Sequence, residues 1–156
     1  ILGARPDINY SAHTHSRAGA AVSAMKCGLL PLSQHAGLIM PTVCIHPYQD
    51  VTTAEDECEA LAKDIGENFA MIMENHGLLA CGRSIGECFY YLYYLETACK
   101  IQVDVLASGQ EPLLLSEKIV DGLFTDGDVP KNEPSGADDW KPQLRWVDRN
   151  MPGYRD

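Results

Sequence analysis

The sequence contains no apolar run long enough to cross a membrane. Its longest candidate, from Ala18 to Met25, is broken by Gly19 and Ser23, whereas a membrane-spanning helix needs about 20 consecutive apolar residues. The chain also lacks a charged N-terminal segment followed by an apolar stretch and a small-residue cleavage site, which is the pattern of an export signal. The sequence therefore argues against an integral membrane protein and predicts a cytoplasmic one.

Basic side chains are scarce. Lys and Arg total 12 against 22 Asp and Glu, which gives a net charge of −10. Binding to nucleic acids and to anionic lipids depends mainly on basic side chains that neutralise phosphates. We therefore expect neither a nucleic acid nor a membrane as a partner, and we interpret the acidic excess as solvated helix faces.

C-x-x-C pairs are absent, which argues against a zinc knuckle and against a thioredoxin-like redox site. The six cysteines could form three disulfides, but a chain of this length buries enough surface without covalent cross-links. Most of them lie in apolar runs, where a free thiol packs as a small hydrophobic group. We predict reduced cysteines, which again indicates a cytoplasmic protein.

The composition is that of one ordinary globular domain. Of the 156 residues, 46% are hydrophobic and 22% are charged, close to the average soluble protein. No internal repeat and no low-complexity tract is present. We therefore expect a single domain with a hydrophobic core.

Hydrophobic periodicity and turn residues predict alternating strands and helices. Ser16 is expected to cap one helix, Thr53 with Asp56 approximates a capping box, and Ser84 with Glu87 forms a better one. Strands are expected at residues 8–13, 39–45, 69–73 and 78–81, helices at 17–26, 53–65, 84–107, 116–124 and 139–149, and loops at 28–36 and 125–137.

The long helix predicted at 84–107 has apolar residues at spacings of three and four. Its other faces carry Tyr90, Tyr91, Tyr93 and Tyr94, which is more aromatic surface than a solvent-facing helix usually has. Either the helix is buried on two sides, or the tyrosines form a protein interface. The sequence leaves both interpretations open.

Three histidines could act together. His13 and His15 are two residues apart, so on a strand they point to one face about 6.5–7 Å apart and can reach one cation. His76 stands between Asn75 and Gly77 in a predicted hairpin turn. Three neutral imidazoles with an open fourth position form the usual catalytic zinc site.

The alternative is a structural role for these histidines. His76 would then only shape the hairpin, while His13 and His15 would form hydrogen bonds in a polar cleft. The remaining two histidines, His35 and His46, lie near loop prolines, and we interpret each as a surface or packing residue.

Several segments resemble the class II aldolase/adducin family, in that family's order. They are RPDINYSAHTHSRAGAAVSA, LLPLSQHA, and the hairpin ENHGLLACG followed by SIGECFYYLYYLETACKIQ. The resemblance runs from about Arg5 to about Leu106 and corresponds to the C-terminal two-thirds of the family's domain. It implies that residues 1–156 form one such domain without its N-terminal part, with residues 110–156 as a C-terminal extension of the same domain.

The resemblance implies an α/β fold with three layers, α/β/α, around a mostly antiparallel sheet. It also implies that His13, His15 and His76 hold a divalent metal ion, with zinc expected. Enzymes of the family, such as L-fuculose-phosphate aldolase and ribulose-phosphate 4-epimerase, are typically homotetramers with active sites between subunits. We therefore expect a homotetramer that acts on a small-molecule substrate.

The activity implied by the resemblance is that of a metal-dependent lyase, which performs reversible aldol cleavage of a small, sugar-like hydroxy-carbonyl compound. The alternatives are a decarboxylase or 4-epimerase of the same family, and a non-catalytic adducin-like interaction module without the metal. The family's acidic proton-transfer residue and its phosphate-binding residues precede the H-x-H motif and are expected upstream of Ile1. The catalytic residue therefore stays unassigned.

Overall fold

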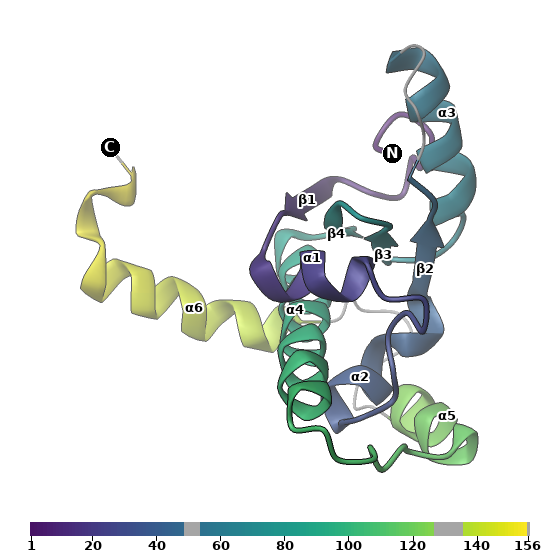
Figure 1. Cartoon of the computed structure of the whole chain (residues 1–156). Helices are drawn as coiled ribbons and strands as arrows, with labels where there is room; N and C mark the ends of the chain where they lie inside the picture. The colour runs from purple at the N-terminus through teal and green to yellow at the C-terminus, as the bar shows by residue number, and fades with distance from the viewer. Residues whose placement is uncertain (49–53, 127–135, 156) are drawn as a thin grey trace.

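The computed structural model describes residues 1–48, 54–126 and 136–155. At its centre is a four-stranded sheet in the order β1-β4-β3-β2 (Figure 1). β4 pairs antiparallel with both β1 and β3, and β2 pairs parallel with β3, which confirms a mostly antiparallel sheet. The strands are β1 (Tyr10–Thr14), β2 (Val43–His46), β3 (Ala70–Met73) and β4 (Gly77–Gly82).

Helices pack on both faces of this sheet (Figure 1). The helices of the described residues are α1 (Arg17–Ser23), α2 (Gln34–Ile39), α3 (Ala54–Ile65), α4 (Ile85–Ala107), α5 (Glu117–Asp126) and α6 (Ala137–Asn150), with 3-10 turns at Met40–Thr42 and Pro152–Arg155. Of these, α1 to α4 contribute to the core beside the sheet.

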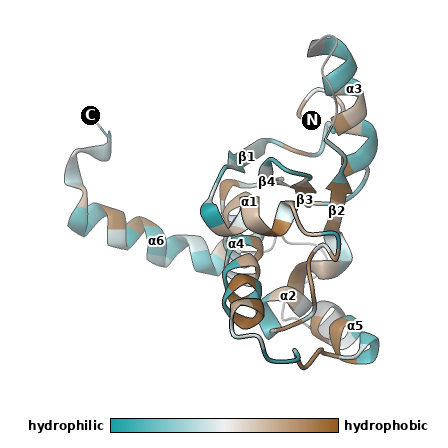
Figure 2. Ribbon diagram, viewed as in Figure 1, coloured by the Kyte–Doolittle hydropathy of each residue, from teal (hydrophilic) through white to brown (hydrophobic). Residues whose placement is uncertain are grey.

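The alternation of side chains along β3 explains the layers. Ala70 and Ile72 point to the face covered by α1, α2 and α4, while Met71 and Met73 point to the opposite face and share a core cluster with Ile65 of α3. Figure 2 shows the apolar residues concentrated on the central strands and on the helices that pack against them. The predicted three-layer α/β/α architecture is confirmed.

The predicted helix caps are confirmed at two serines. The side chain of Ser16 accepts a hydrogen bond from the backbone N–H of Gly19 at the start of α1. Ser84 does the same for Glu87 at the start of α4, and the Glu87 carboxylate accepts from the backbone N–H of Arg83, 2.7 Å away. Thr53 of the third predicted cap lies outside the described residues.

The prediction was wrong between residues 34 and 42. Instead of a loop to residue 36 and a strand from residue 39, the chain forms α2, then a 3-10 turn, and β2 begins only at Val43. Ser33 caps α2, and Ala36 and Ile39 are buried in the helix. Of the predicted strand, Ile39 lies in the buried helix, whereas the residues from Val43 onward form β2 as expected.

The tyrosines of α4 have different environments, and burial accounts for three of the four. Tyr91 is buried in the core, with its ring stacked on Phe69. Tyr90 and Tyr94 are half-buried with their ring centroids 4.5 Å apart, and burial raises the pKa of Tyr90. Only Tyr93 is largely exposed, at 51%.

The C-terminal helices contact the body at different places. The backbone N–H of Leu115, just before α5, donates to the carbonyl of Pro31, and Leu123 lies against Gly37 of α2. α6 extends away from the body (Figure 1) and meets it through Trp140, whose ring centroid is 5.4 Å from that of Phe89. None of the helices in the described ranges is long and apolar enough to span a bilayer.

Candidate metal centre

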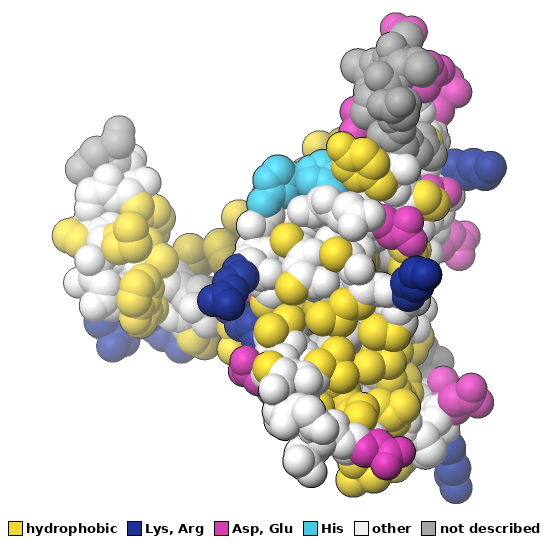
Figure 3. Space-filling model, viewed as in Figure 1, with side chains coloured by type: hydrophobic (Ala, Val, Ile, Leu, Met, Phe, Trp, Pro, Cys, Tyr) yellow, Lys and Arg dark blue, Asp and Glu magenta, His cyan; other side chains and the backbone are white. Residues whose placement is uncertain are grey.

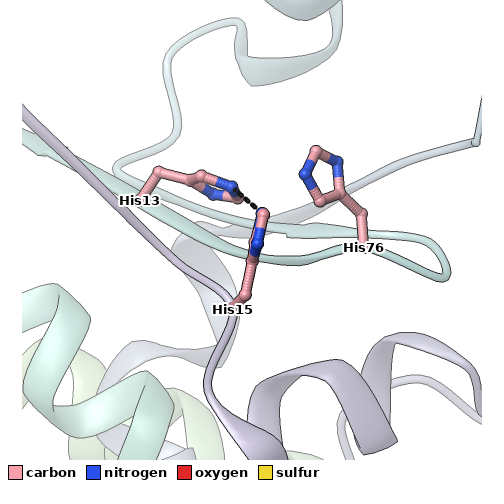
Figure 4. Close-up of side chains that lie close together, drawn as sticks. All are labelled: His13, His15 and His76. Atoms are coloured by element: carbon pink, nitrogen blue, oxygen red, sulfur yellow. Dashed lines mark hydrogen bonds between the residues drawn. The ribbon is translucent and has the colours of Figure 1, made fainter.

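The pairing of β1 with β4 brings the three predicted histidines together. His13 lies on β1 and His15 immediately follows it, while His76 is the last residue of the turn that leads into β4. Because Thr14 pairs with Leu78 in this antiparallel register, the end of β1 lies beside the start of β4. The imidazole centroids are 4.5, 4.6 and 4.8 Å apart (Figure 4).

The turn that carries His76 is held from several sides. Asn75 has a left-handed backbone (φ 52°), which asparagine tolerates better than most residues, and its N–H donates to the carbonyl of Ser23 in α1. The N–H of Glu74 donates to the carbonyl of His46 in β2. Main-chain hydrogen bonds to two neighbouring elements thus fix the position of the turn.

His13 is oriented by a hydrogen bond behind its ring. Its Nδ1 lies 2.8 Å from the carbonyl oxygen of Leu78; a carbonyl only accepts, so Nδ1 carries the proton and Nε2 presents a lone pair. This Nε2 is 2.7 Å from Nε2 of His15, as the dashed line in Figure 4 shows. A carbonyl behind a ring in this way is the usual partner of a metal-binding histidine.

The donor set fits a divalent ion. One nitrogen from each of the three rings lies within 4.8 Å of the others. A tetrahedral zinc site with Zn–N bonds of about 2.0–2.1 Å keeps its nitrogens about 3.3 Å apart. Small side-chain rotations therefore suffice for the three rings to share one ion.

The environment of His76 favours its neutral imidazole form. His13 and His15 are exposed and His76 is half-buried. The pKa of His76 is lowered, first by burial and then by the neighbouring His13 and His15. Figure 3 shows the histidine side chains gathered on the surface next to hydrophobic ones. Neutral imidazole is the form that binds a metal ion.

A pocket of about 100 Å³ adjoins this three-histidine cluster, and sequence reasoning did not anticipate it. His46, Glu57, Glu74 and His76 line it, together with Pro47, Tyr48 and Met73. His46 is buried, and its Nδ1 lies 2.7 Å from Oδ2 of Asp64 in α3. Its interpretation as a surface or packing residue missed this pair, for which the local sequence contains no signal.

The other histidine does not join the cluster. His35 is half-buried, and its ring centroid lies 5.5 Å from that of Tyr94. This contact agrees with the predicted packing role.

Comparison with known proteins places the chain in a family. Residues 1–103 match the sequence profile described as "Class II Aldolase and Adducin N-terminal domain". The whole chain is 35% identical over 156 residues to the "Putative aldolase class 2 protein" of Caulobacter vibrioides and covers 61% of it. It is also 46% identical to alpha-adducin of Rattus norvegicus over 113 residues, which are 72% of this chain and 15% of that protein.

Solved structures share the fold. The match with an aldolase II superfamily protein from Pseudomonas syringae covers 100% of this chain and 62% of the chain of that structure, with a TM-score of 0.90 and 36% identity. The match with the L-fuculose 1-phosphate aldolase from Glaciozyma antarctica PI12 covers 96% of this chain and 55% of the chain of that structure, with a TM-score of 0.78 and 22% identity.

This chain spans only 61% of the length of the Caulobacter relative and 62% of the chain of the Pseudomonas syringae structure. Within that span the agreement extends from the sequence profile to the complete described fold. The chain belongs to the class II aldolase and adducin family.

Proposed function

We propose that this protein is a metal-dependent lyase that makes or breaks a C–C bond beside the carbonyl group of a small hydroxylated substrate. The observation that supports this most is the convergence of His13, His15 and His76, each with a ring nitrogen within 4.8 Å of the other two. Three imidazoles that leave one coordination position open suit a divalent ion, with zinc expected.

The chain's own residues prepare the site in two ways. The Leu78 carbonyl holds the tautomer of His13, so that Nε2 faces the other two histidines. The lowered pKa of His76 keeps this ring neutral at pH values where an ordinary histidine starts to take up a proton. A divalent cation, when bound, supplies Lewis-acid stabilisation of the negative charge that develops beside a carbonyl group.

Related reactions need the same stabilisation. Aldol cleavage, decarboxylation next to a carbonyl and 4-epimerisation through retro-aldol cleavage all build up negative charge at the carbon beside the carbonyl. The three-histidine cluster would serve each of them, and we propose the aldol reaction first. No residue among 1–156 is assigned the role of proton carrier.

A second candidate is an adducin-like interaction module. It is favoured by the 46% identity to rat alpha-adducin, which exceeds the 35% identity to the Caulobacter protein although it extends over a shorter segment. Such a module would use the fold and its surface and would not require a metal ion.

Metal analysis of the purified protein separates the two candidates. We expect about one zinc or similar divalent ion per chain, and cleavage of a hydroxy-carbonyl substrate that stops with a chelator and returns with added metal. A protein that stays metal-free after zinc is supplied, and that shows no cleavage, would support the interaction module instead.

Three further features belong to this proposal. We propose a cytoplasmic homo-oligomer, expected to be a tetramer, in which the exposed Tyr93 of α4 takes part in the contact between subunits. We also propose that residues 110–156 extend the same domain. The contacts of Leu123 with Gly37 and of Trp140 with Phe89 support that assignment.

A further inference from the structure

His46 lies beside the three-histidine cluster and is held in one orientation. Its backbone carbonyl accepts the N–H of Glu74 at 2.8 Å, and its ring Nδ1 lies 2.7 Å from the Asp64 carboxylate. The residue is 5% exposed. Both the main chain and the ring are therefore fixed, although the residue ends an edge strand.

Asp64 decides which nitrogen of His46 carries the proton. An ionised carboxylate only accepts hydrogen bonds, so Nδ1 must be the donor, and the neutral ring presents a lone pair at Nε2. Among the hydrogen bonds between residues of the ranges 1–48, 54–126 and 136–155, none involves this Nε2. A fixed acceptor is thus available on the wall that His46 contributes to the pocket.

The charge and size of this pocket restrict what the acceptor can bind. Glu57 and Glu74 also line it, and no Lys or Arg is among its described lining residues. Carboxylates at close range repel a phosphate or carboxylate group. A volume of about 100 Å³ holds only a small group. An uncharged hydroxyl group can donate a hydrogen bond to Nε2 without this electrostatic repulsion.

We propose that His46, oriented by Asp64, accepts a hydrogen bond from an uncharged hydroxyl group of the substrate, so that the pocket binds the hydroxymethyl end of a neutral hydroxy-carbonyl compound. This inference rests on the proposed function, because it requires the three-histidine cluster to bind the carbonyl end of the same molecule. The pocket also borders His76, so that a small molecule can reach both places.

Two probes test the assignment with the zinc-loaded full chain. Hydroxyacetone and dihydroxyacetone each have a carbonyl with a neighbouring hydroxyl, but only dihydroxyacetone has a second hydroxyl. Their dissociation constants are measured by NMR titration for the wild type and for His46→Asn. The asparagine amide can still donate to Asp64, whereas the acceptor at the Nε2 position is lost.

We expect His46→Asn to weaken the binding of dihydroxyacetone about three- to tenfold, the usual effect of one lost hydrogen bond. The dissociation constant of hydroxyacetone should stay within about twofold of the wild-type value. His46→Gln, whose amide oxygen reaches the Nε2 position, should bind dihydroxyacetone more tightly than His46→Asn does. His35→Asn, a matched change at the histidine packed on Tyr94, should affect neither probe. Circular dichroism checks that each variant is folded.

The possible failures are distinguishable. A wild-type protein that holds no zinc and binds neither probe contradicts the proposed function itself. Suppose instead that the wild type holds zinc and binds hydroxyacetone. If His46→Asn then changes the affinities for the two probes equally, or changes neither, only the proposed role of His46 is overturned. The decisive quantity is the difference between the changes in affinity for the two probes, because the carbonyl end is the same in both.

Discussion

Gly77 lies directly against the backbone of Thr14, so that a Cβ atom on Gly77 would overlap the Thr14 carbonyl oxygen. The same Cβ would stand 3.2 Å from Cδ2 of His15. This close approach lets the turn with His76 meet the end of β1, and it leaves no space for a side chain.

We therefore expect Gly77→Ala to lower the free energy of unfolding by about 1–3 kcal/mol, the usual cost of forcing extra atoms into a packed site. Urea unfolding followed by circular dichroism measures it. Gly122→Ala is the matched control, because the described part of the chain places no atom of another element within 4 Å of its Cβ position in α5; it should be neutral or stabilising by up to about 1 kcal/mol. Equal stability of Gly77→Ala and the wild type would contradict this account of the turn.

Removal of one histidine of the cluster should release the metal. We expect His76→Ala and His13→Ala to bind zinc at least about tenfold more weakly than the wild type, because two imidazoles seldom retain an ion that three can hold. Equilibrium dialysis against a competing chelator measures the affinity. His35→Ala should bind zinc like the wild type. Stoichiometric zinc in His76→Ala under these conditions would remove this residue from the proposed ligand set.

The acidic lining of the pocket should discriminate against phosphorylated compounds. Glu57 borders the pocket, whereas Glu59 on the same helix is exposed and does not. We expect Glu57→Gln to strengthen the binding of dihydroxyacetone phosphate several-fold, since a repulsive charge is removed, and to leave dihydroxyacetone unchanged. Glu59→Gln should change neither affinity. Dihydroxyacetone phosphate that binds the wild type more tightly than dihydroxyacetone would show that the pocket accepts an anion.

The buried thiols should make the protein sensitive to alkaline pH. All six cysteines are free, and burial raises the pKa of Cys44, Cys81 and Cys88 from 9.0 to about 11 and that of Cys99 to about 12. As pH rises, these thiols lose their protons at a lower pH in the unfolded chain than in the folded one. Their contribution to the free energy of unfolding is therefore fully present below about pH 9 and is lost as pH rises toward 11 to 12.

Urea unfolding midpoints from pH 8 to 11 test this, and they should fall as pH rises. Alkylation at pH 8 provides a second measurement. The exposed Cys27 and Cys58 should react well before the buried cysteines. Uniform reaction of all six cysteines in the folded protein would contradict the burial that underlies the raised pKa values.

Local sequence was sufficient for much of the fold. The apolar spacing and the Ser84–Glu87 cap predicted α4, and the hairpin between β3 and β4 was predicted to within one residue at each strand. These features depend on residues close together in the chain, where periodicity and turn chemistry act directly. α2 was missed, because this short helix depends on burial against distant residues such as Leu123 and not on a pattern in its own sequence.

The sequence by itself indicated that His13 and His15 can face one side of the chain and that His76, in a predicted hairpin turn, could join them, and the family resemblance implied the same three residues. Only the tertiary structure decided that these rings meet, because that depends on the pairing of β1 with β4, in which His13 reaches Leu78 across 65 residues. The pair of His46 and Asp64 depends entirely on how α3 packs beside β2. No spacing rule predicts such a contact, because the packing of whole elements, and not the local order of residues, sets the distance between the two side chains.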